Sequence, residues 1–305
     1  MLRARWDGRP GRLEVWYTTL TGLWLHHELV APADGAPAYA HGWVAVFPAS
    51  GRPTLARFGP EPWQAPDEPA VFACGPVTVT PDRLTGRAGD CAWDLTATGG
   101  GEPLYTFPRW AWRRELLPAA QIVPAPSVSF TGTVQCGQST VDITGVPGAS
   151  ARIYGHGNAR RWGWLHADLG NGDVCEVVAA VSTRPGLALL PPLPLVRLHL
   201  GGVDLPSGDP LLAALRFRAT LGRPQWTVRG RFADRRLAIT VSQPSDRTVS
   251  VDYTNPDGST AVCHNSERAD AVIALDRSGP DGWRRERTWR LDGTAHAEVG
   301  WATRR

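Results

Sequence analysis

One short segment of the chain concentrates side chains that can carry out acid–base chemistry. If residues 162–168 form a β-strand, alternate side chains point to the same face, which places Trp162, Trp164, His166 and Asp168 together. An imidazole and a carboxylate can transfer protons, and indole faces can stabilise a developing cation. We therefore predict His166 and Asp168 as catalytic residues and the two tryptophans as ligand-binding residues. Alternatively, His166 and Asp168 form hydrogen bonds that are purely structural.

Three polar residues separated by glycines precede this segment. They are Tyr154, His156 and Asn158, and the glycines between them predict a turn or a close backbone approach. We expect Tyr154 and Asn158 to contact a ligand and His156 to assist catalysis. Two imidazoles and one carboxylate, from His156, His166 and Asp168, would suit a metal ion, but no short ligand spacing supports this site. We therefore predict no metal.

A second cluster of aromatic and titratable residues lies near the N-terminus. Trp24, His26 and Glu28 alternate onto one face of a predicted strand, and Trp16 lies on the strand before it. A zinc-binding His-Glu-x-x-His pattern is excluded because position 31 is alanine. Trp16, Trp24 and His26 are candidate ligand-binding residues, but a structural role near the mouth of a barrel is favoured for this cluster.

The C-terminal segment carries a third candidate acid. His296 and Glu298 share one face of the last predicted strand. A buried glutamate there would have a raised pKa and could donate a proton. A solvent-exposed surface carboxylate is the alternative, and both remain open.

The elements that must position these residues are predicted to be short β-strands. Glycine and proline supply 33 and 27 residues, and segments with period-two alternation lie between them. Helical signal is weak, and the best candidate is 209–221, where Asp209 can cap the helix and Pro210 suits its first turn. The prediction is an all-β fold with two antiparallel barrel or sandwich halves and few short helices.

Prolines between positions 185 and 194 interrupt the strand pattern and suggest a boundary. The expected domains are 1–188 and 189–305. An eight-stranded barrel can hold one small ligand, so two such halves would account for the chain. The 14 tryptophans either fill the cores or line a cavity for a flat or polyene-like ligand.

Composition excludes several other classes of function. All 32 basic residues are arginine, which excludes Schiff-base lysines, pyridoxal-phosphate sites and phosphate-loop lysines. The arginines are scattered and the formal charge is only +3, so nucleic-acid binding is not expected. No run approaches about 20 apolar residues and the N-terminus lacks a secretory signal, so we expect a cytoplasmic protein without an integral membrane segment. Nothing indicates an oligomeric state, or whether Cys74 and Cys91 pair.

The chain resembles the lipocalin-like (calycin) superfamily of tocopherol cyclases, hydroxyneurosporene synthases and AttH-like proteins. The segments that carry the resemblance are 132–137, Gly155-His156, 161–166, the opening Trp6-Asp-Gly with 14–17, and the closing 296–300. The resemblance implies two calycin-like halves, an apolar pocket and chemistry on isoprenoid double bonds or polyenes without an organic cofactor. Its candidate residues are Trp162, Trp164, His166 and Asp168, with His156 and Glu298 nearby.

Two hypotheses follow from these observations. The first is a cofactor-independent cyclase, hydratase or isomerase, in which Asp168 or Glu298 donates a proton to a hydrophobic isoprenoid, polyene or polyketide-like molecule. The second is a non-catalytic carrier or sensor of a hydrophobic ligand. Convergence of His166, Asp168 and Glu298 on one cavity would favour the enzyme. If these side chains point apart or into solvent, the enzyme hypothesis fails in this form.

Overall fold

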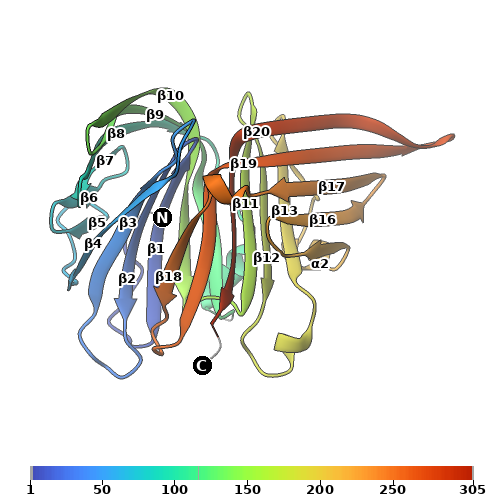
Figure 1. The fold of residues 1–305 in the computed structure, drawn as a ribbon. Helices are drawn as coiled ribbons and strands as arrows, with labels where there is room; N and C mark the ends of the chain where they lie inside the picture. Colours follow the sequence, from blue (N-terminus) through green and yellow to red (C-terminus); the bar gives the residue numbers. More distant parts are fainter. Residues whose placement is uncertain (1–2, 116, 304–305) are drawn as a thin grey trace.

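The chain forms two ten-stranded antiparallel sheets, one after the other in the sequence (Figure 1). A computed structural model describes residues 3–115 and 117–303. The only α-helices in these ranges are α1 (Arg109–Arg114) and α2 (Pro210–Ala214), and there are two 3-10 turns, η1 (Leu187–Leu189) and η2 (Ser245–Arg247). The predicted all-β class with few short helices is confirmed.

The first sheet curls into a nearly closed barrel. Its spatial order is β4-β3-β2-β1-β10-β9-β8-β7-β6-β5, and β4 at one edge packs against β5 at the other. Alternate residues, among them Trp16, Leu25 and Phe130, fill its interior. Its strands are β1 (Arg12–Leu20), β2 (Leu23–Ala31), β3 (Tyr39–Val46), β4 (Thr54–Pro62), β5 (Phe72–Cys74), β6 (Val77–Val79), β7 (Arg83–Ala88), β8 (Cys91–Gly100), β9 (Ala119–Cys136) and β10 (Ser139–Gly155).

The second sheet has the order β14-β13-β12-β11-β20-β19-β17-β16-β15, and β18 pairs with β19 outside this path. Leu165, Phe217 and Trp226 belong to the core on its inner side. Its strands are β11 (Arg161–Gly170), β12 (Asp173–Val181), β13 (Leu193–Leu200), β14 (Val203–Leu205), β15 (Phe217–Thr220), β16 (Gln225–Phe232), β17 (Arg235–Ser242), β18 (Val249–Thr254), β19 (Thr260–Gly279) and β20 (Gly282–Ala302).

The chain passes from one sheet to the other between Gly155 and Arg161. This point lies earlier than the boundary expected at residues 188 and 189. Strands β11 and β12, which that boundary assigned to the first half, are hydrogen-bonded members of the second sheet. The proline-rich segment instead lies between two neighbouring strands of that sheet, β12 and β13.

Helix α2 begins where the sequence predicted but is shorter than expected. The Asp209 side chain accepts hydrogen bonds from the backbone N–H groups of Leu211 (2.8 Å) and Leu212 (3.3 Å), and Pro210 occupies the first turn. The helix ends at Ala214 because residues from Phe217 onward pair with β16. Within the described residues, neither helix is long and apolar enough to cross a bilayer.

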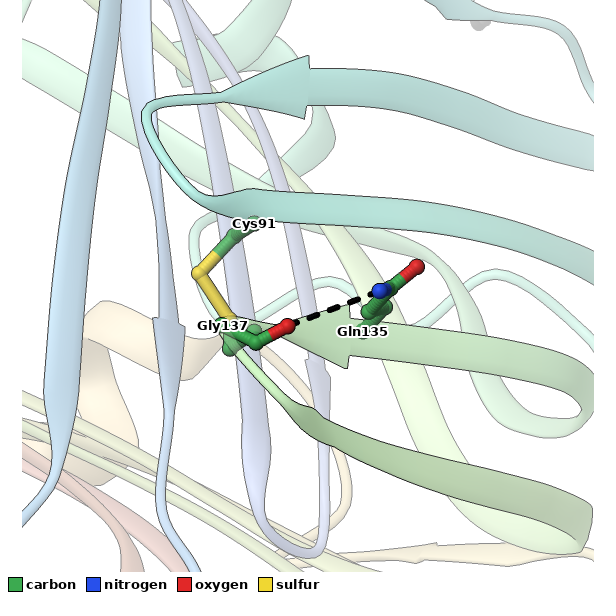
Figure 2. The surroundings of a disulfide bond; sticks show 4 residues. Cys91, Gln135 and Gly137 are labelled. Atoms are coloured by element: carbon green, nitrogen blue, oxygen red, sulfur yellow. Dashed lines mark hydrogen bonds between the residues drawn. A yellow bond between two sulfur atoms is a disulfide. The ribbon is translucent and has the colours of Figure 1, made fainter.

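A disulfide joins the ends of β8 and β9, where Cys91 and Cys136 lie directly opposite each other (Figure 2). The side-chain amide of Gln135 donates a hydrogen bond to the carbonyl oxygen of Gly137 in the adjoining turn. Cys74, whose pairing with Cys91 the sequence left open, is a free buried thiol. The disulfide therefore cross-links β8 and β9 at one end of this strand pair.

A third core lies between the two sheets. The first sheet contributes Tyr17, Trp24 and Trp43 from β1, β2 and β3, and the second contributes aromatic residues from β11 and β18. On β11, Leu165 and Ala167 belong to the core of the second sheet, whereas Trp162 and Trp164 point the other way, toward the first sheet. The strongest sequence cluster therefore faces the space between the sheets.

Candidate active site

A cavity of about 650 Å³ lies between the two sheets, within the size range of small-molecule pockets. Its walls come from β1, β2, β9 and β10 on one side and from β11, β12, β13, β18 and β20 on the other. Most of the lining is apolar, and the polar side chains that reach it are few. They are Tyr17, His26, Glu28, Gln121, Asn158, Ser182, Thr183, Arg184, Arg218, Tyr253 and Glu298.

Glu298 on β20 is a buried carboxyl held by donors from both sheets. Its Oε1 accepts a hydrogen bond from Trp162 Nε1 (2.8 Å), and its Oε2 accepts one from the Tyr17 hydroxyl (3.1 Å). Asn265 Nδ2 donates to the oxygen of the Tyr17 hydroxyl (2.7 Å), which leaves the hydroxyl proton of Tyr17 directed at Glu298. Burial and the negative charge of Glu298 raise the pKa of Tyr17 well above its usual value. Tyr17 therefore acts as a fixed neutral donor.

The indole of Trp162 can reach Glu298 because position 300 is glycine. A Cβ atom at Gly300 would lie 2.2 Å from Trp162 Cζ2, far inside van der Waals contact. The two residues face each other across the β11–β20 pairing. Any larger residue at position 300 would displace the indole from Glu298.

Glu28 on β2 is a second buried carboxyl at the cavity, and its environment differs from that of Glu298. Its Oε2 lies 3.1 Å from His26 Nε2 and 3.4 Å from His41 Nε2. Burial raises the pKa of Glu28 and lowers that of His26 well below its usual value. The His26 ring stacks on Trp43, with 3.9 Å between the ring centroids. The pair is therefore a neutral imidazole beside a carboxyl that holds its proton more tightly than a solvated one.

Glu176 on β12 connects the sequence-predicted His166 to the cavity wall. Glu176 is fully buried and accepts hydrogen bonds from the indole N–H of Trp164 and from Gln121 Nε2 (3.2 Å). His166 Nδ1 lies 2.8 Å from its second oxygen. Trp164 and Gln121 line the cavity, whereas His166 and Glu176 lie behind them. His166 is thus placed to hold Glu176 and Trp164 rather than to touch a ligand.

A further imidazole–carboxyl pair lies deeper between the sheets. His296 Nδ1 lies 2.8 Å from Glu267 Oε1, and the Thr19 hydroxyl donates to the other oxygen of Glu267. Burial alone would lower the pKa of His296, but Glu267 and the neighbouring carboxylates outweigh it and raise the pKa. Burial also raises the pKa of Glu267. His296 packs against Trp164 and Tyr17, so this pair supports the cavity wall from behind.

The structure brings only some of the predicted residues to the cavity. Glu298, Trp162, Trp164, His26 and Asn158 line it. Among the others, Trp24 is buried one layer behind, in edge-to-face contact with His26 and in tilted ring contact with Tyr17. Trp16 points into the barrel of the first sheet instead, because it alternates with Val15 and Tyr17 along β1.

Besides His166, Trp16 and Trp24, three more predicted residues lie outside the cavity lining. Asp168 accepts a hydrogen bond from the backbone N–H of Gly170 (2.7 Å) and shapes the turn after β11. His156 is exposed and contacts Arg12 through Nδ1 (2.9 Å). The Tyr154 ring is covered by the Arg5 guanidinium. His156, His166 and Asp168 thus have separate partners, and within residues 3–115 and 117–303 no group of three potential ligands could hold a metal.

Several residues at the cavity or directly behind its wall were not predicted as site residues, among them Glu28, Glu176 and Tyr253. Strand alternation placed Glu28 on the same face as His26, but only His26 of the two was predicted to bind a ligand. Glu176 is the single charged residue inside the apolar run Val174–Val181, which is itself a signal of a buried functional or structural group. Tyr253 lines the cavity from β18 and packs edge-to-face on His26 and Trp162, and no local pattern pointed to it.

These features define a lipocalin-like β protein with an aromatic cavity between two sheets. Residues 78–301 match the family model described as tocopherol cyclase-like, and the chain belongs to this family. Uncharacterized protein Rv0493c of Mycobacterium tuberculosis (strain H37Rv) is 50% identical over 302 residues, which cover 97% of this chain and 88% of the relative. Uncharacterized protein MT0513 from the CDC 1551 strain matches to the same extent.

Solved structures share the fold at low sequence identity. An AttH-like protein from Nitrosomonas europaea has a TM-score of 0.58 at 14% identity, covering 96% of this chain and 93% of its own. CghA, solved with Sch210972, has a TM-score of 0.59 at 12% identity, covering 95% and 88%. The predicted resemblance to tocopherol cyclase-like and AttH-like proteins is therefore confirmed.

Proposed function

We propose that this protein is a cofactor-independent cyclase, hydratase or isomerase that acts on a hydrophobic isoprenoid, polyene or polyketide-like molecule. One observation carries the proposal: two buried carboxyls with different environments, Glu28 and Glu298, line the same apolar and aromatic cavity. Pairs of titratable groups held in different environments are typical of acid–base catalysis. Membership of the tocopherol cyclase-like family supports a cyclisation reaction.

The two carboxyls have complementary roles in this proposal. Glu28, whose pKa burial raises, donates its proton to a double bond or carbonyl group of the ligand. Glu298 has Trp162 Nε1 and the Tyr17 hydroxyl directed at its two oxygens, an arrangement that suits a carboxylate. Glu298 stabilises the cation and then accepts the proton lost when the product forms. One proton enters the ligand and one leaves it, so cyclisation or isomerisation needs no other reagent.

The aromatic residues of the cavity suit a cationic intermediate. Trp162, Trp164 and Tyr253 present ring surfaces to the cavity, and ring faces attract positive charge. When a ligand fills the cavity, the surrounding aliphatic side chains would keep water from the intermediate, which water would otherwise trap as an alcohol. Hydration, the remaining reaction in this class, requires a water molecule beside Glu298.

A carrier is the second candidate function, and a specific observation favours it. His166 and Asp168 are held in hydrogen bonds with Glu176 and with the turn backbone, as expected if they are structural. In a carrier, the carboxyls would only orient a polar group of the ligand. That CghA, a protein with this fold, has been solved with a small molecule is compatible with both functions.

Ligand binding and turnover can be measured on one protein preparation. Quenching of tryptophan fluorescence by isoprenoid quinols, carotenoids, fatty acids and sterols measures binding, and mass spectrometry of each bound ligand detects conversion. Saturable quenching with a product that disappears in Glu28→Gln or Glu298→Gln establishes the enzyme. Quenching with unchanged ligand establishes the carrier. Absence of quenching by every compound refutes both.

A further inference from the structure

Large apolar side chains are exposed around one part of the molecule. Of the nine such residues in 3–115 and 117–303, six lie in two short segments, 187–193 and 212–215. Leu189 is 86% exposed, Leu212 69% and Leu215 64%. Soluble proteins seldom expose so many large apolar side chains together unless the surface binds something.

Both segments border the opening of the cavity. Leu187, Leu190, Leu193 and Leu215 line the cavity and are exposed to solvent at the same time, so they mark its mouth. The first segment contains η1 and links β12 to β13, in the yellow part of the ribbon in Figure 1, and α2 packs against β13. The exposed leucines therefore form a rim around the entrance.

The charges on this rim have one sign. Residues 182–195 and 211–218 contain Arg184, Arg216 and Arg218 and no aspartate or glutamate. All three arginines are exposed, and Arg184 and Arg218 line the mouth itself. A partner that covers this rim must accept apolar side chains in its centre and offer negative charge around them.

We propose that the rim, defined as segments 182–195 and 211–218, docks onto an anionic lipid bilayer. Leu189, Leu212 and Leu215 insert among the acyl chains at the interface, and the arginines contact lipid phosphates. The cavity then opens into the apolar layer in which a hydrophobic ligand dissolves. The reason for docking rests on the proposed function, but the docking itself does not require catalysis.

Co-sedimentation with lipid vesicles tests this proposal. We expect the full-length protein to bind vesicles of phosphatidylcholine mixed with phosphatidylglycerol, to bind phosphatidylcholine alone less, and to dissociate as salt is added. The double variant Leu189→Asp with Leu212→Asp should lower the partition coefficient by at least about tenfold. Both positions are exposed, so the fold should tolerate the changes.

A matched control lies elsewhere on the surface. Val141 is 43% exposed but belongs to β10 of the first sheet, outside the rim. Val141→Asp adds one negative charge at another exposed apolar site and is compared with the single variant Leu189→Asp. We expect Val141→Asp to leave vesicle binding within about twofold of the unmodified protein. Equal loss in this control would show that added negative charge, not the rim, weakens binding, and would overturn the proposal.

Other outcomes also decide the question. Absence of vesicle binding by the unmodified protein overturns the proposal. If the unmodified protein does not bind vesicles, and light scattering shows that it is a dimer that the double rim variant converts to a monomer, then a second copy of the chain covers the rim instead. Fluorescence quenching without vesicles is measured in parallel. Quenching without docking refutes only the docking, and docking without quenching refutes only the proposed function.

Discussion

Replacing Glu298 by glutamine separates a catalytic role of this carboxyl from a structural one. Both of its oxygens accept hydrogen bonds, from Trp162 Nε1 and from the Tyr17 hydroxyl. The amide of glutamine has one acceptor oxygen and one NH₂ group. If the oxygen faces the indole, the NH₂ faces the Tyr17 hydroxyl, which already accepts from Asn265 and then has no acceptor for its proton. Either orientation leaves a buried donor unpaired.

The expected effects on stability and on turnover differ in size. An unpaired buried donor costs about 1–3 kcal/mol. At roughly 2–4 °C per kcal/mol, the unfolding midpoint should fall by roughly 2–12 °C. Loss of a positioned acid–base group should lower turnover by about 10²–10⁴-fold. Ligand affinity should change less than about tenfold, or about 1.4 kcal/mol, because the cavity keeps its apolar walls.

Glu176→Gln is the matched control for this variant. Glu176 is also buried and also accepts an indole N–H bond, from Trp164, but it does not line the cavity. It should lose similar stability, measured by circular dichroism during heating, while turnover falls far less. If Glu298→Gln keeps wild-type turnover, or if both variants lose turnover equally, the assignment of Glu298 as the group that receives the proton is refuted.

Three further predictions concern other parts of the molecule. Burial raises the pKa of Glu28 in the folded state, so above pH 4.5 or so the unfolded state loses this proton more readily and the free energy of unfolding of the wild type falls. Glu28→Gln cannot ionise, so it should become more stable relative to the wild type as the pH rises, and it should abolish turnover because the proposed proton donor is gone. Denaturant titrations that show the same stability difference between the two proteins at every pH from 4 to 8 would contradict this. Gly300→Ala should displace the Trp162 indole and so reduce turnover. Gly86→Ala is the control, because its added methyl group would meet the Trp93 ring in the first barrel at a similar distance; an equal loss of turnover in both variants would contradict the prediction. Reduction of the Cys91–Cys136 disulfide should cost about 4 kcal/mol for a sequence separation of 45, measured by denaturant unfolding with and without reductant, and leave ligand affinity unchanged.

The sequence predicted the fold class well because the signal is local. Alternation along β11 correctly separated Leu165, which faces the core of the second sheet, from Trp162 and Trp164 on the opposite face. The position of the cavity was harder to predict, because it depends on how the two sheets pack. We expected ligands inside the barrel halves, whereas the interiors are filled with side chains and the space lies between the sheets.

The surroundings of individual side chains were hard to predict where a strand ended or where partners were distant in sequence. Asp168 was expected beside His166. However, β11 ends in a turn at Gly170, and the Asp168 carboxylate accepts a hydrogen bond from the backbone N–H of that glycine. Glu176 meets His166 only through the pairing of β11 with β12, and Glu28 reaches the cavity only because the first sheet packs against the second. Such contacts are set by register and sheet packing, which short motifs do not encode.

The division of the site between the sheets has a chemical consequence. Glu28 and Tyr17 come from the first sheet, and Glu298 and Trp162 come from the second. Neither sheet alone holds both carboxyls, so the proposed proton donor and acceptor are brought together only when the two halves pack. Their distance across the cavity then depends on side chains of the shared core, such as Tyr17, which contacts Trp164 at 4.5 Å between ring centroids and donates to Glu298. Mild substitutions in this core should therefore change turnover while both sheets remain folded.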